Sequence, residues 1–327
     1  MNSRSNEVPV LLIGYNRPEK LASLIDSLRS TAPARIVVSV DGPKPNDDHD
    51  LEKVRRTRDQ VSRIDWPSQV TTRFRETNIG LRRAVEDAVT WVTSEYGSAI
   101  IIEDDTVAGP HLVDYLDAML DLYAEREDIM HVSGYNVVPG SILRTESGSR
   151  FSRYPESFAW ATWERAWKHY DSDLTWATSV SINELSRMLG STTAALRWKI
   201  NFRDAATGRI GSWAYRWIGS IWQRNGLTIA PNQNLAHYAG FDGGTHTLRR
   251  PRWTDLPMGG QLDDLTGSVH TDPSADLWTG RTVFNETPFG LLDGVASSLA
   301  LASRKRYRSV KSNLTQARAN SSANRPG

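Results

Sequence analysis

Three adjacent acidic residues, Glu103, Asp104 and Asp105, directly follow the apolar run 99–102. The run is typical of a buried strand, so the acids are expected at the end of a rigid element. Carboxylate oxygens are the ligands that Mg²⁺ and Mn²⁺ prefer, and Mg²⁺ sites often combine one or two carboxylates with phosphate oxygens. Acids in a loop are more often solvated charge, but this position favours a site for a divalent cation and a phosphate-bearing ligand.

Asp41 follows a second apolar run, 36–40, and precedes Gly42 and Pro43. In an open α/β sheet the ligand crevice lies beyond the carboxyl ends of the strands. Asp41 and the acidic triplet are therefore expected at one edge of the sheet. An alternative interpretation stays open, in which Asp41 only forms the turn before Gly42 and Pro43.

Strand and helix patterns alternate over roughly the first 135 residues. This alternation predicts an α/β fold, a mostly parallel sheet with helices on both faces. Asn16 is the expected N-cap of the first helix, with Pro18 in its first turn, and Leu81 is expected on the inward face of a later helix. The expected strands are 10–13, 36–40, 70–74, 99–102 and 129–132, and the expected helices begin near 18, 50, 80 and 111.

The alternation is lost after about Gly134, and most of the 12 tryptophans lie in this later part. No linker rich in glycine, serine or proline separates the two parts. We therefore expect residues 1–135 to form the ligand-binding core and residues 136–302 to pack on the same sheet as part of one catalytic domain. Residues 303–327 are expected to be a basic, disordered tail.

Composition excludes several classes of protein. The 327 residues include no cysteine, which excludes disulfides and thiolate metal sites. Residues 1–7 are short and polar without the apolar region of a signal peptide, and no apolar run approaches the length of a membrane span. These features predict a cytoplasmic protein.

Charge is distributed unevenly along the chain. The formal net charge is +1, while residues 303–327 contain seven basic residues and no acid, which leaves −6 for residues 1–302. A negative net charge on residues 1–302 argues against nucleic-acid binding. The tail could contact an anionic membrane surface as a peripheral attachment at the inner face, or it could simply be a solvated end.

Several stretches of the first part together resemble the GT-A nucleotide-sugar-binding domain. Within that fold they are similar to the inverting enzymes related to N-acetylglucosaminyltransferase I and to their bacterial sugar-transferase relatives. In the second part the resemblance extends to motifs on the acceptor side. The matching stretches are 10–18, 40–44, 78–84 and 100–105, then 158–163, 213–217, 231–235 and 240–247.

The resemblance implies a GT-A (Rossmann-like) fold with a tryptophan-rich acceptor-side extension. It also implies a nucleotide-sugar donor, with a UDP-sugar favoured, and Mn²⁺ or Mg²⁺ as the cofactor. The expected acceptor is a growing bacterial polysaccharide, a glycolipid or a protein-linked glycan. Asp105 is the expected direct metal ligand. Glu103 and Asp104 are expected to orient the sugar, the ribose or the water shell of the metal, and Asp41 to bind the pyrimidine or the ribose.

Three further residues are assigned to the donor side. Asn78 and Arg82 are expected near the nucleotide, because Gly80 allows a close approach of the backbone there. Arg82 could instead be a surface charge on a helix. His246 is a candidate metal ligand, since many GT-A enzymes have a late histidine that coordinates the ion, but a structural histidine is the alternative.

On the acceptor side the candidates are aromatic. Trp160, Trp213, Tyr215 and Trp217 lie in the matching stretches. Aromatic faces suit the apolar faces of pyranose rings, so some of these side chains could stack on an acceptor sugar. Core or interface packing is the default interpretation for most of the tryptophans.

The chain departs from the family pattern where the general base is expected. Bacterial members of the group read Trp-Asp-Tyr where this chain has Ala214 after Trp213, and alanine cannot accept a proton. Three hypotheses remain: the residue was changed to trap substrates, another acid such as Asp204 is the base, or the chain binds its donor without turnover. The intact motif around Ala214 favours the first.

Two other functions stay open. A sugar-nucleotide transferase, which makes activated sugars, would need a glycine-rich phosphate loop after the first strand, and residues 14–18 form a poor one. A catalytically inactive module that binds carbohydrate or nucleotide is the second alternative, and only Ala214 supports it.

Overall fold

The computed structural model of this chain describes residues 8–144, 148–240, 254, 256–259 and 269–300. The strands of its large sheet are β1 (Val10–Gly14), β2 (Arg35–Val40), β3 (Gln69–Phe74), β4 (Ser98–Glu103), β6 (Ile129–Ser133), β7 (Ser149–Ser152), β8 (Ala159–Trp163) and β9 (Leu227–Pro231).

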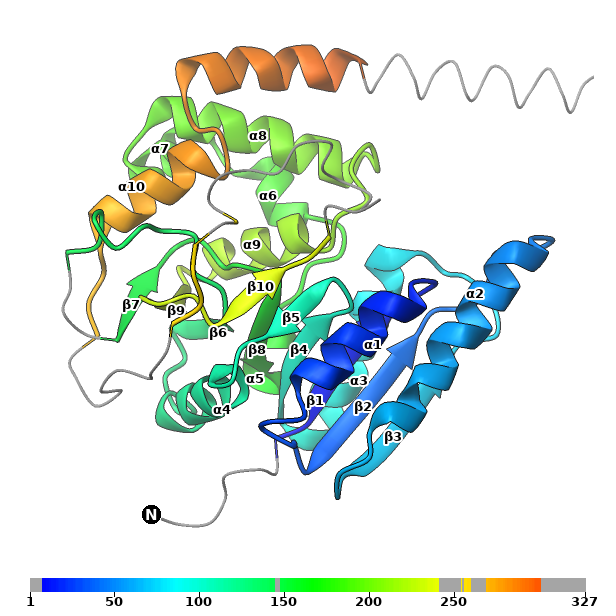
Figure 1. The fold of residues 1–327 in the computed structure, drawn as a ribbon. Helices are drawn as coiled ribbons and strands as arrows, with labels where there is room; N and C mark the ends of the chain where they lie inside the picture. The colour runs from blue at the N-terminus through cyan, green and yellow to red at the C-terminus, as the bar shows by residue number, and fades with distance from the viewer. Residues whose placement is uncertain (1–7, 145–147, 241–253, 255, 260–268, 301–327) are drawn as a thin grey trace, which may run out of the picture.

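These strands form one eight-stranded sheet within the described residues, in the order β3-β2-β1-β4-β8-β6-β9-β7 (Figure 1). Neighbouring strands run parallel, except that β8 is antiparallel to β4 and β6, and β7 is antiparallel to β9. β1, β2 and β4 are almost entirely apolar because helices cover both of their faces. The prediction of an α/β protein with a mostly parallel sheet and flanking helices is confirmed.

The strand order reverses between β1 and β4. The helices α1 (Pro18–Ser27) and α2 (Asp48–Asp59) follow β1 and β2 and cover one face of the sheet, and α3 (Leu81–Tyr96) leads to β4 across the other face (Figure 1). In such sheets ligands bind beyond the carboxyl ends of the strands, at the point of reversal. That point lies between the segment after β1 and the acidic triplet after β4.

The second half of the chain extends the same sheet. β8 pairs with β4, with Trp160 opposite Ile101, and β6, β9 and β7 continue beyond it. A small ribbon of β5 (Thr106–Ala108) and β10 (Ala236–Tyr238) lies beside α1. The remaining helices are α4 (Leu112–Leu122), α5 (Glu164–Trp167), α6 (Thr175–Ser179), α7 (Ile182–Leu189), α8 (Thr192–Ala206), α9 (Ala214–Gln223) and α10 (Pro273–Thr282).

Two local predictions were wrong. Leu81 is 44% exposed, because it is the first residue of α3 and lies at the helix end beyond the packed turns. Asn16 does not cap α1: the N-cap is Arg17, which makes no side-chain cap hydrogen bond. The amide of Asn16 donates to Asp50 instead, and Pro18 begins the helix because its missing N–H needs no cap.

The C-terminal part of the described chain ends in a helix. Residues 288–300 are helical and lie along the outer side of α8, at the top of Figure 1. The predicted tail, 303–327, lies outside the described residues. No helix within the described part of the chain is long and apolar enough to cross a bilayer.

Candidate functional site

Side chains from the ends of β1 and β4 meet where the strand order reverses. The guanidinium of Arg17 donates to Asp104 and, over 3.1 Å, to Oδ2 of Asp105. Asp104 is 3% exposed, and its Oδ2 has no hydrogen-bond partner among the described residues. Asp104 is therefore a buried carboxyl group whose polar contacts are incomplete.

The loop that carries Arg17 is itself fixed by a buried acid. Asp50, in the first turn of α2, accepts hydrogen bonds from the hydroxyl of Tyr15, from Nδ2 of Asn16 (2.6 Å) and from the N–H of Lys44 (2.7 Å). Burial alone would raise the pKa of Asp50, and these hydrogen bonds outweigh it, so the pKa is lowered. An ionised Asp50 thus ties the segment after β1 to α2.

Burial and mutual repulsion favour the protonated forms of two acids in the triplet. Burial, with repulsion from Asp105 and Asp104, raises the pKa of Glu103 to about 8. Burial also raises the pKa of Asp104 to about 7, although Arg17 acts in the opposite direction. A cationic ligand at this edge would stabilise the ionised forms, so the triplet is electrostatically suited to bind one.

Glu103 connects the acidic edge to the second half of the chain. The indole Nε1–H of Trp213, the residue before α9, donates to Oε1 of Glu103 over 3.2 Å. Trp213 in turn stacks on Trp160 of β8, with ring centroids 5.1 Å apart. Two groups of residues predicted for different sides of the site, donor acids and acceptor-side aromatics, are thus in direct contact.

Asp41 makes a complete set of internal hydrogen bonds. Its Oδ1 accepts from the N–H groups of Gly42 (2.9 Å) and Ile79 (3.1 Å), and its Oδ2 from Nδ2 of Asn78 (3.0 Å) and the N–H of Gly80 (3.0 Å). These four bonds hold the loop before α3 against the end of β2. Asn78 therefore donates to Asp41 in this structure. The contacts of Asp41 agree with the alternative interpretation, in which this residue stabilises a loop.

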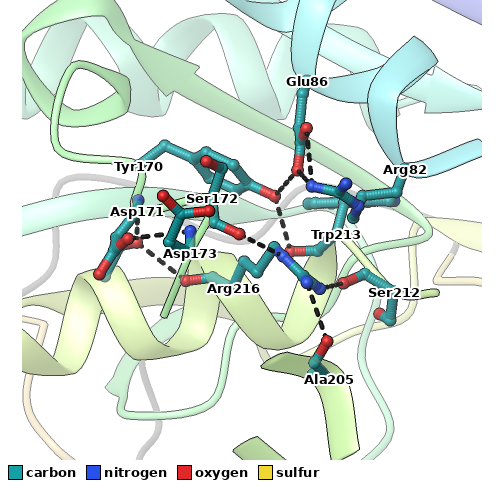
Figure 2. A network of polar contacts seen from close by, with 11 residues as sticks. Arg82, Glu86, Tyr170, Asp171, Ser172, Asp173, Ala205, Ser212, Trp213 and Arg216 are labelled. Atoms are coloured by element: carbon teal, nitrogen blue, oxygen red, sulfur yellow. Dashed lines mark hydrogen bonds and ion pairs between the residues drawn. The ribbon is translucent and has the colours of Figure 1, made fainter. Parts of the chain in front are cut away.

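Arg82 is paired within α3. Its Nη1 donates to both carboxylate oxygens of Glu86, at 3.0 and 3.2 Å (Figure 2). The hydroxyl of Tyr170 donates to Oε1 of Glu86 over 2.8 Å and lies 3.4 Å from the carbonyl oxygen of Trp213. Burial raises the pKa of Tyr170, which keeps this hydroxyl protonated. The chain Arg82–Glu86–Tyr170 thus links α3 to the start of α9.

The expected base position, Ala214, begins α9 next to this contact. Two residues on, the buried Arg216 donates to three carbonyl oxygens, those of Ser172 (2.7 Å), Ser212 (2.8 Å) and Ala205 (2.8 Å), as Figure 2 shows. Burial lowers the pKa of Arg216. The guanidinium of Arg216 thereby connects the start of α9 to the carbonyl groups of three other positions. The backbone at position 214 is held in place by these bonds.

The other aromatic candidates are packed inside the protein. Trp160 and Trp217 are 0% and 1% exposed, and Trp217 donates its indole N–H to Nδ1 of His131 over 3.1 Å. Tyr215 packs edge-on against Trp198. Core packing, the default interpretation, therefore describes Trp160 and Trp217, and within this aromatic group it is Trp213 that reaches the acidic edge.

Asp204, the alternative base, is held by other partners. It is 3% exposed and accepts hydrogen bonds from Nη1 of Arg209 and from the hydroxyl of Ser298, both over 2.8 Å. Ser298 belongs to the helical segment 288–300. The bond from Ser298 fastens that segment to α8, and the bond from Arg209 ties Asp204 to the loop after α8. A carboxylate engaged in this way is poorly placed to accept a proton from a substrate.

The acidic residues at the end of β4 could provide part of the ligand shell of a divalent cation. The donors are all carboxylate oxygens, which suit Mg²⁺ and Mn²⁺, and the unpartnered Oδ2 of Asp104 is one of them. Within the described residues no three acidic or histidine side chains converge as a complete metal cage. His246 lies outside those residues. The fit is thus to a site where the protein gives one or two carboxylates and a phosphate ligand completes the shell.

Sequence reasoning missed Arg17, Glu86 and Tyr170. Arg17 had a usable signal, because it follows the first strand of a parallel sheet and so lies at the same edge as Asp105. Glu86 and Tyr170 had none, because their contact joins positions 84 residues apart. No known protein-family model matches the chain, and no curated protein is similar enough to be matched to it. The function is therefore inferred from the geometry of the site.

Proposed function

We propose that this chain is a metal-dependent, inverting glycosyltransferase of the GT-A type. Its donor is a nucleotide sugar, with UDP the favoured nucleotide, and its acceptor is a glycan, a glycolipid or a protein-linked glycan. The observation that carries this proposal is the contact of Arg17 with Asp104 and Asp105 at the reversal of strand order. Parallel sheets bind nucleotide ligands at that point.

The donor side supports this function through charge. A divalent cation held by Asp105, with Asp104 near it, would offset the charge that develops on the leaving diphosphate. Arg17 already lies between these acids and could turn to a phosphate oxygen, because guanidinium groups bind phosphate in a bidentate manner. Glu103, held by the indole of Trp213, is available to accept a hydrogen bond from a sugar hydroxyl.

The acceptor side supports it through position. Trp213 contacts Glu103, and position 214 is the next residue after Trp213 in the chain. An acid there would be placed to take a proton from an attacking hydroxyl, as inverting transfer requires. With Ala214 in that position, we expect the chain to bind its substrates but transfer sugar slowly.

A screen of nucleotide sugars by thermal unfolding tests the donor. A ligand that binds only the folded state at 100 times its Kd stabilises it by about 2.7 kcal/mol. We expect one UDP-sugar to raise Tm in the presence of Mn²⁺ and much less in the presence of EDTA. Equal shifts with and without the metal, or no shift with any nucleotide sugar, would contradict the proposal.

Turnover of Ala214→Asp tests the base. A positioned base contributes roughly 10²- to 10⁴-fold to the rate, so Ala214→Asp should raise kcat by about that factor with little change in donor affinity. Ala214→Asn is the matched control, because its side chain has nearly the same shape but accepts no proton. Brisk transfer by the unchanged chain that is lost in Asp204→Asn would move the base to Asp204.

A binding module without catalysis is the second candidate function, and Ala214 is the observation that favours it. The two candidates differ in one result. If Ala214→Asp binds donor and acceptor yet shows no transfer and no donor hydrolysis above the Ala214→Asn control, the chain is a binding module.

The location of the chain is part of the same proposal. A cytoplasmic enzyme acting on a lipid-linked or polymeric acceptor would gain from contact with the inner face of the membrane. The seven basic residues of the segment 303–327 suit such a peripheral contact with anionic lipid.

A further inference from the structure

The helical segment 288–300 packs on the protein through its smallest residues. Gly290, Gly294 and Ser298, four residues apart, form its buried face. A Cβ at Gly294 would overlap the guanidinium of Arg197, so the segment passes directly over the end of this α8 side chain. Ser298 donates to Asp204 over 2.8 Å and accepts from Arg203 over 3.2 Å. The segment is therefore attached by contacts and hydrogen bonds of its small residues with α8 side chains, rather than by large apolar side chains of its own.

Its large apolar side chains point the other way. Phe289, Leu292 and Val295 are 78%, 69% and 44% exposed, and their spacing of three places them on one outward face. In a helix that only packs on a globular body, the large apolar residues are the ones expected inside. Figure 1 shows this helix along the outside of α8, so its outer face is directed away from the fold.

The charge of the sequence that follows this helix indicates what covers its outward face. Within 25 residues of sequence, 303–327, the chain continues with seven basic residues and no acid. Two copies joined through this face would bring two such segments together, and their repulsion disfavours a dimer. An apolar helix face that is followed in the sequence by a basic segment instead matches an anionic lipid surface, which attracts both. Asp293, exposed at the margin of the face, can stay at the level of the headgroups.

We propose that helical residues 288–300 are a docking surface for an anionic bilayer. Phe289, Leu292 and Val295 enter the boundary between headgroups and acyl chains, and the basic residues that follow contact the anionic headgroups. This surface is separate from the acidic edge at β1 and β4, so binding to membranes does not depend on the proposed transferase activity.

Sedimentation of the full chain with vesicles tests this surface. We expect binding to vesicles of phosphatidylcholine with phosphatidylglycerol, and much weaker binding to phosphatidylcholine alone. Each large apolar side chain that is buried contributes roughly tenfold to binding. The double variant Phe289→Ser/Leu292→Ser should therefore lower the affinity by on the order of 10²-fold. Because both side chains are exposed, it should unfold at nearly the same temperature as the unchanged chain.

The matched control is Leu51→Ser/Leu122→Ser, which removes two leucines that are 52% and 55% exposed on α2 and α4. It should bind vesicles as the unchanged chain does. Equal losses in both double variants, or equal binding to neutral and anionic vesicles, would overturn the proposal. So would a dimer of the unchanged chain, seen by light scattering, that becomes a monomer in Phe289→Ser/Leu292→Ser. A shift of Tm with UDP-sugar and Mn²⁺ that is the same in all variants separates this result from the proposed function.

Removing the basic segment 303–327 separates its contribution to vesicle binding from that of the helix 288–300. Truncation after Ala302 should leave Phe289, Leu292 and Val295 in place but weaken binding to anionic vesicles, chiefly at low salt. Its residual binding should be lost in Phe289→Ser/Leu292→Ser. Residual binding that survives the serine substitutions would contradict a role for the helix.

Discussion

Two aspartates at strand ends, Asp41 after β2 and Asp104 after β4, have the same burial and opposite surroundings. Both are 3% exposed and lie at the carboxyl edge of the same parallel sheet. Asp41 accepts four hydrogen bonds from its own and the neighbouring loop. Asp104 contacts Arg17, leaves Oδ2 without a partner in the described structure, and has a pKa raised to about 7.

An aspartate after an apolar strand can therefore have one of two roles, to stabilise a loop or to face a ligand. A carboxylate whose lone pairs are all satisfied by backbone and amide donors stabilises its loop and has little left for a ligand. A buried carboxylate with incomplete contacts and like charges beside it is less stable when ionised, and a bound cation would relieve that. The carboxylate at the end of β2 stabilises its own loop, and the end of β4 is where we propose that a ligand binds.

The largest expected effect concerns ligand binding at β4. Asp105→Ala should lower the Mn²⁺-dependent affinity for a UDP-sugar by on the order of 10²-fold, because it removes a charged ligand of the cation. The fold should persist, since the residue follows the strand outside the core. Calorimetry with UDP and Mn²⁺ measures this, with the exposed Asp114→Ala as control. Unchanged metal-dependent affinity in Asp105→Ala would remove this acid from the site.

The next effect concerns stability and contrasts the two strand ends directly. In Asp41→Asn an amide NH₂ would face two of the four donors and leave both unsatisfied, which should lower the free energy of unfolding by about 2–4 kcal/mol. Asp104→Asn keeps an oxygen that accepts from Arg17, which also stays paired with Asp105, and it removes a buried charge. We therefore expect a change below about 1 kcal/mol in either direction. Denaturant unfolding at pH 7 measures both. Similar losses in the two variants would break the comparison.

The sequence was sufficient to predict the sheet edge but not the roles along it. Apolar runs of four or five residues, each ended by an acid, locate β2 and β4, because buried parallel strands are apolar throughout. Whether a carboxylate is satisfied depends on distant partners: Ile79 and Gly80 reach Asp41 across 38 and 39 positions. Asp41 and Asp104 are therefore equivalent in sequence and different in structure.

The second half was harder to predict for a related reason. β8 enters the sheet antiparallel between β4 and β6, which breaks the alternation on which the sequence argument relied. For the tryptophans at positions 160 and 217 core packing is the default interpretation and stacking on a sugar the alternative, and only the structure decides between these. The resemblance singled out Trp213 for the acceptor side, but its bond to Glu103 spans 110 positions and has no local signal.

A third and smaller effect is a dependence on pH at the β4 end, to which the buried Glu156, whose pKa is also raised to about 8, adds elsewhere in the fold. Glu103 and Asp104 have pKa values raised to about 8 and 7, from 4.5 and 3.8. The folded chain therefore holds more protons than the unfolded chain between about pH 4 and 8. The stability that these groups contribute is complete below pH 4 and is lost as pH rises through 7 to 8.

Binding of donor with Mn²⁺ should change in the opposite direction, because the metal requires ionised carboxylates. We expect the affinity to rise by at most about tenfold per pH unit between pH 6 and 8. Thermal unfolding and calorimetry across this range measure the two trends. In Glu103→Gln/Asp104→Asn the decline of stability between pH 6 and 8 should become shallower, and Glu156 should account for part of what remains. A decline that is unchanged in this double variant would assign the titration to other groups.

The smallest expected effect concerns how strongly Trp213 influences Glu103. The indole N–H donates to Oε1 of Glu103 over 3.2 Å, and this bond lowers the pKa of a carboxyl that burial raises. Trp213→Phe keeps an aromatic ring and removes the donor. The midpoint of the pH dependence of Mn²⁺-dependent binding should therefore move upward, by less than about one pH unit, because a single long hydrogen bond to a charged group is modest.

Trp160→Phe is the matched control for this last variant. Trp160 stacks on Trp213 with centroids 5.1 Å apart, but its own Nε1 has no hydrogen-bond partner in the described part of the chain. Both variants shrink the same aromatic stack, and only Trp213→Phe removes a donor to the acid. A shift of the midpoint in Trp213→Phe alone would show that the acceptor-side helix start tunes the donor acids through this bond. Equal shifts in both variants would assign the effect to packing, and the two sides of the site would then be neighbours without electrostatic coupling.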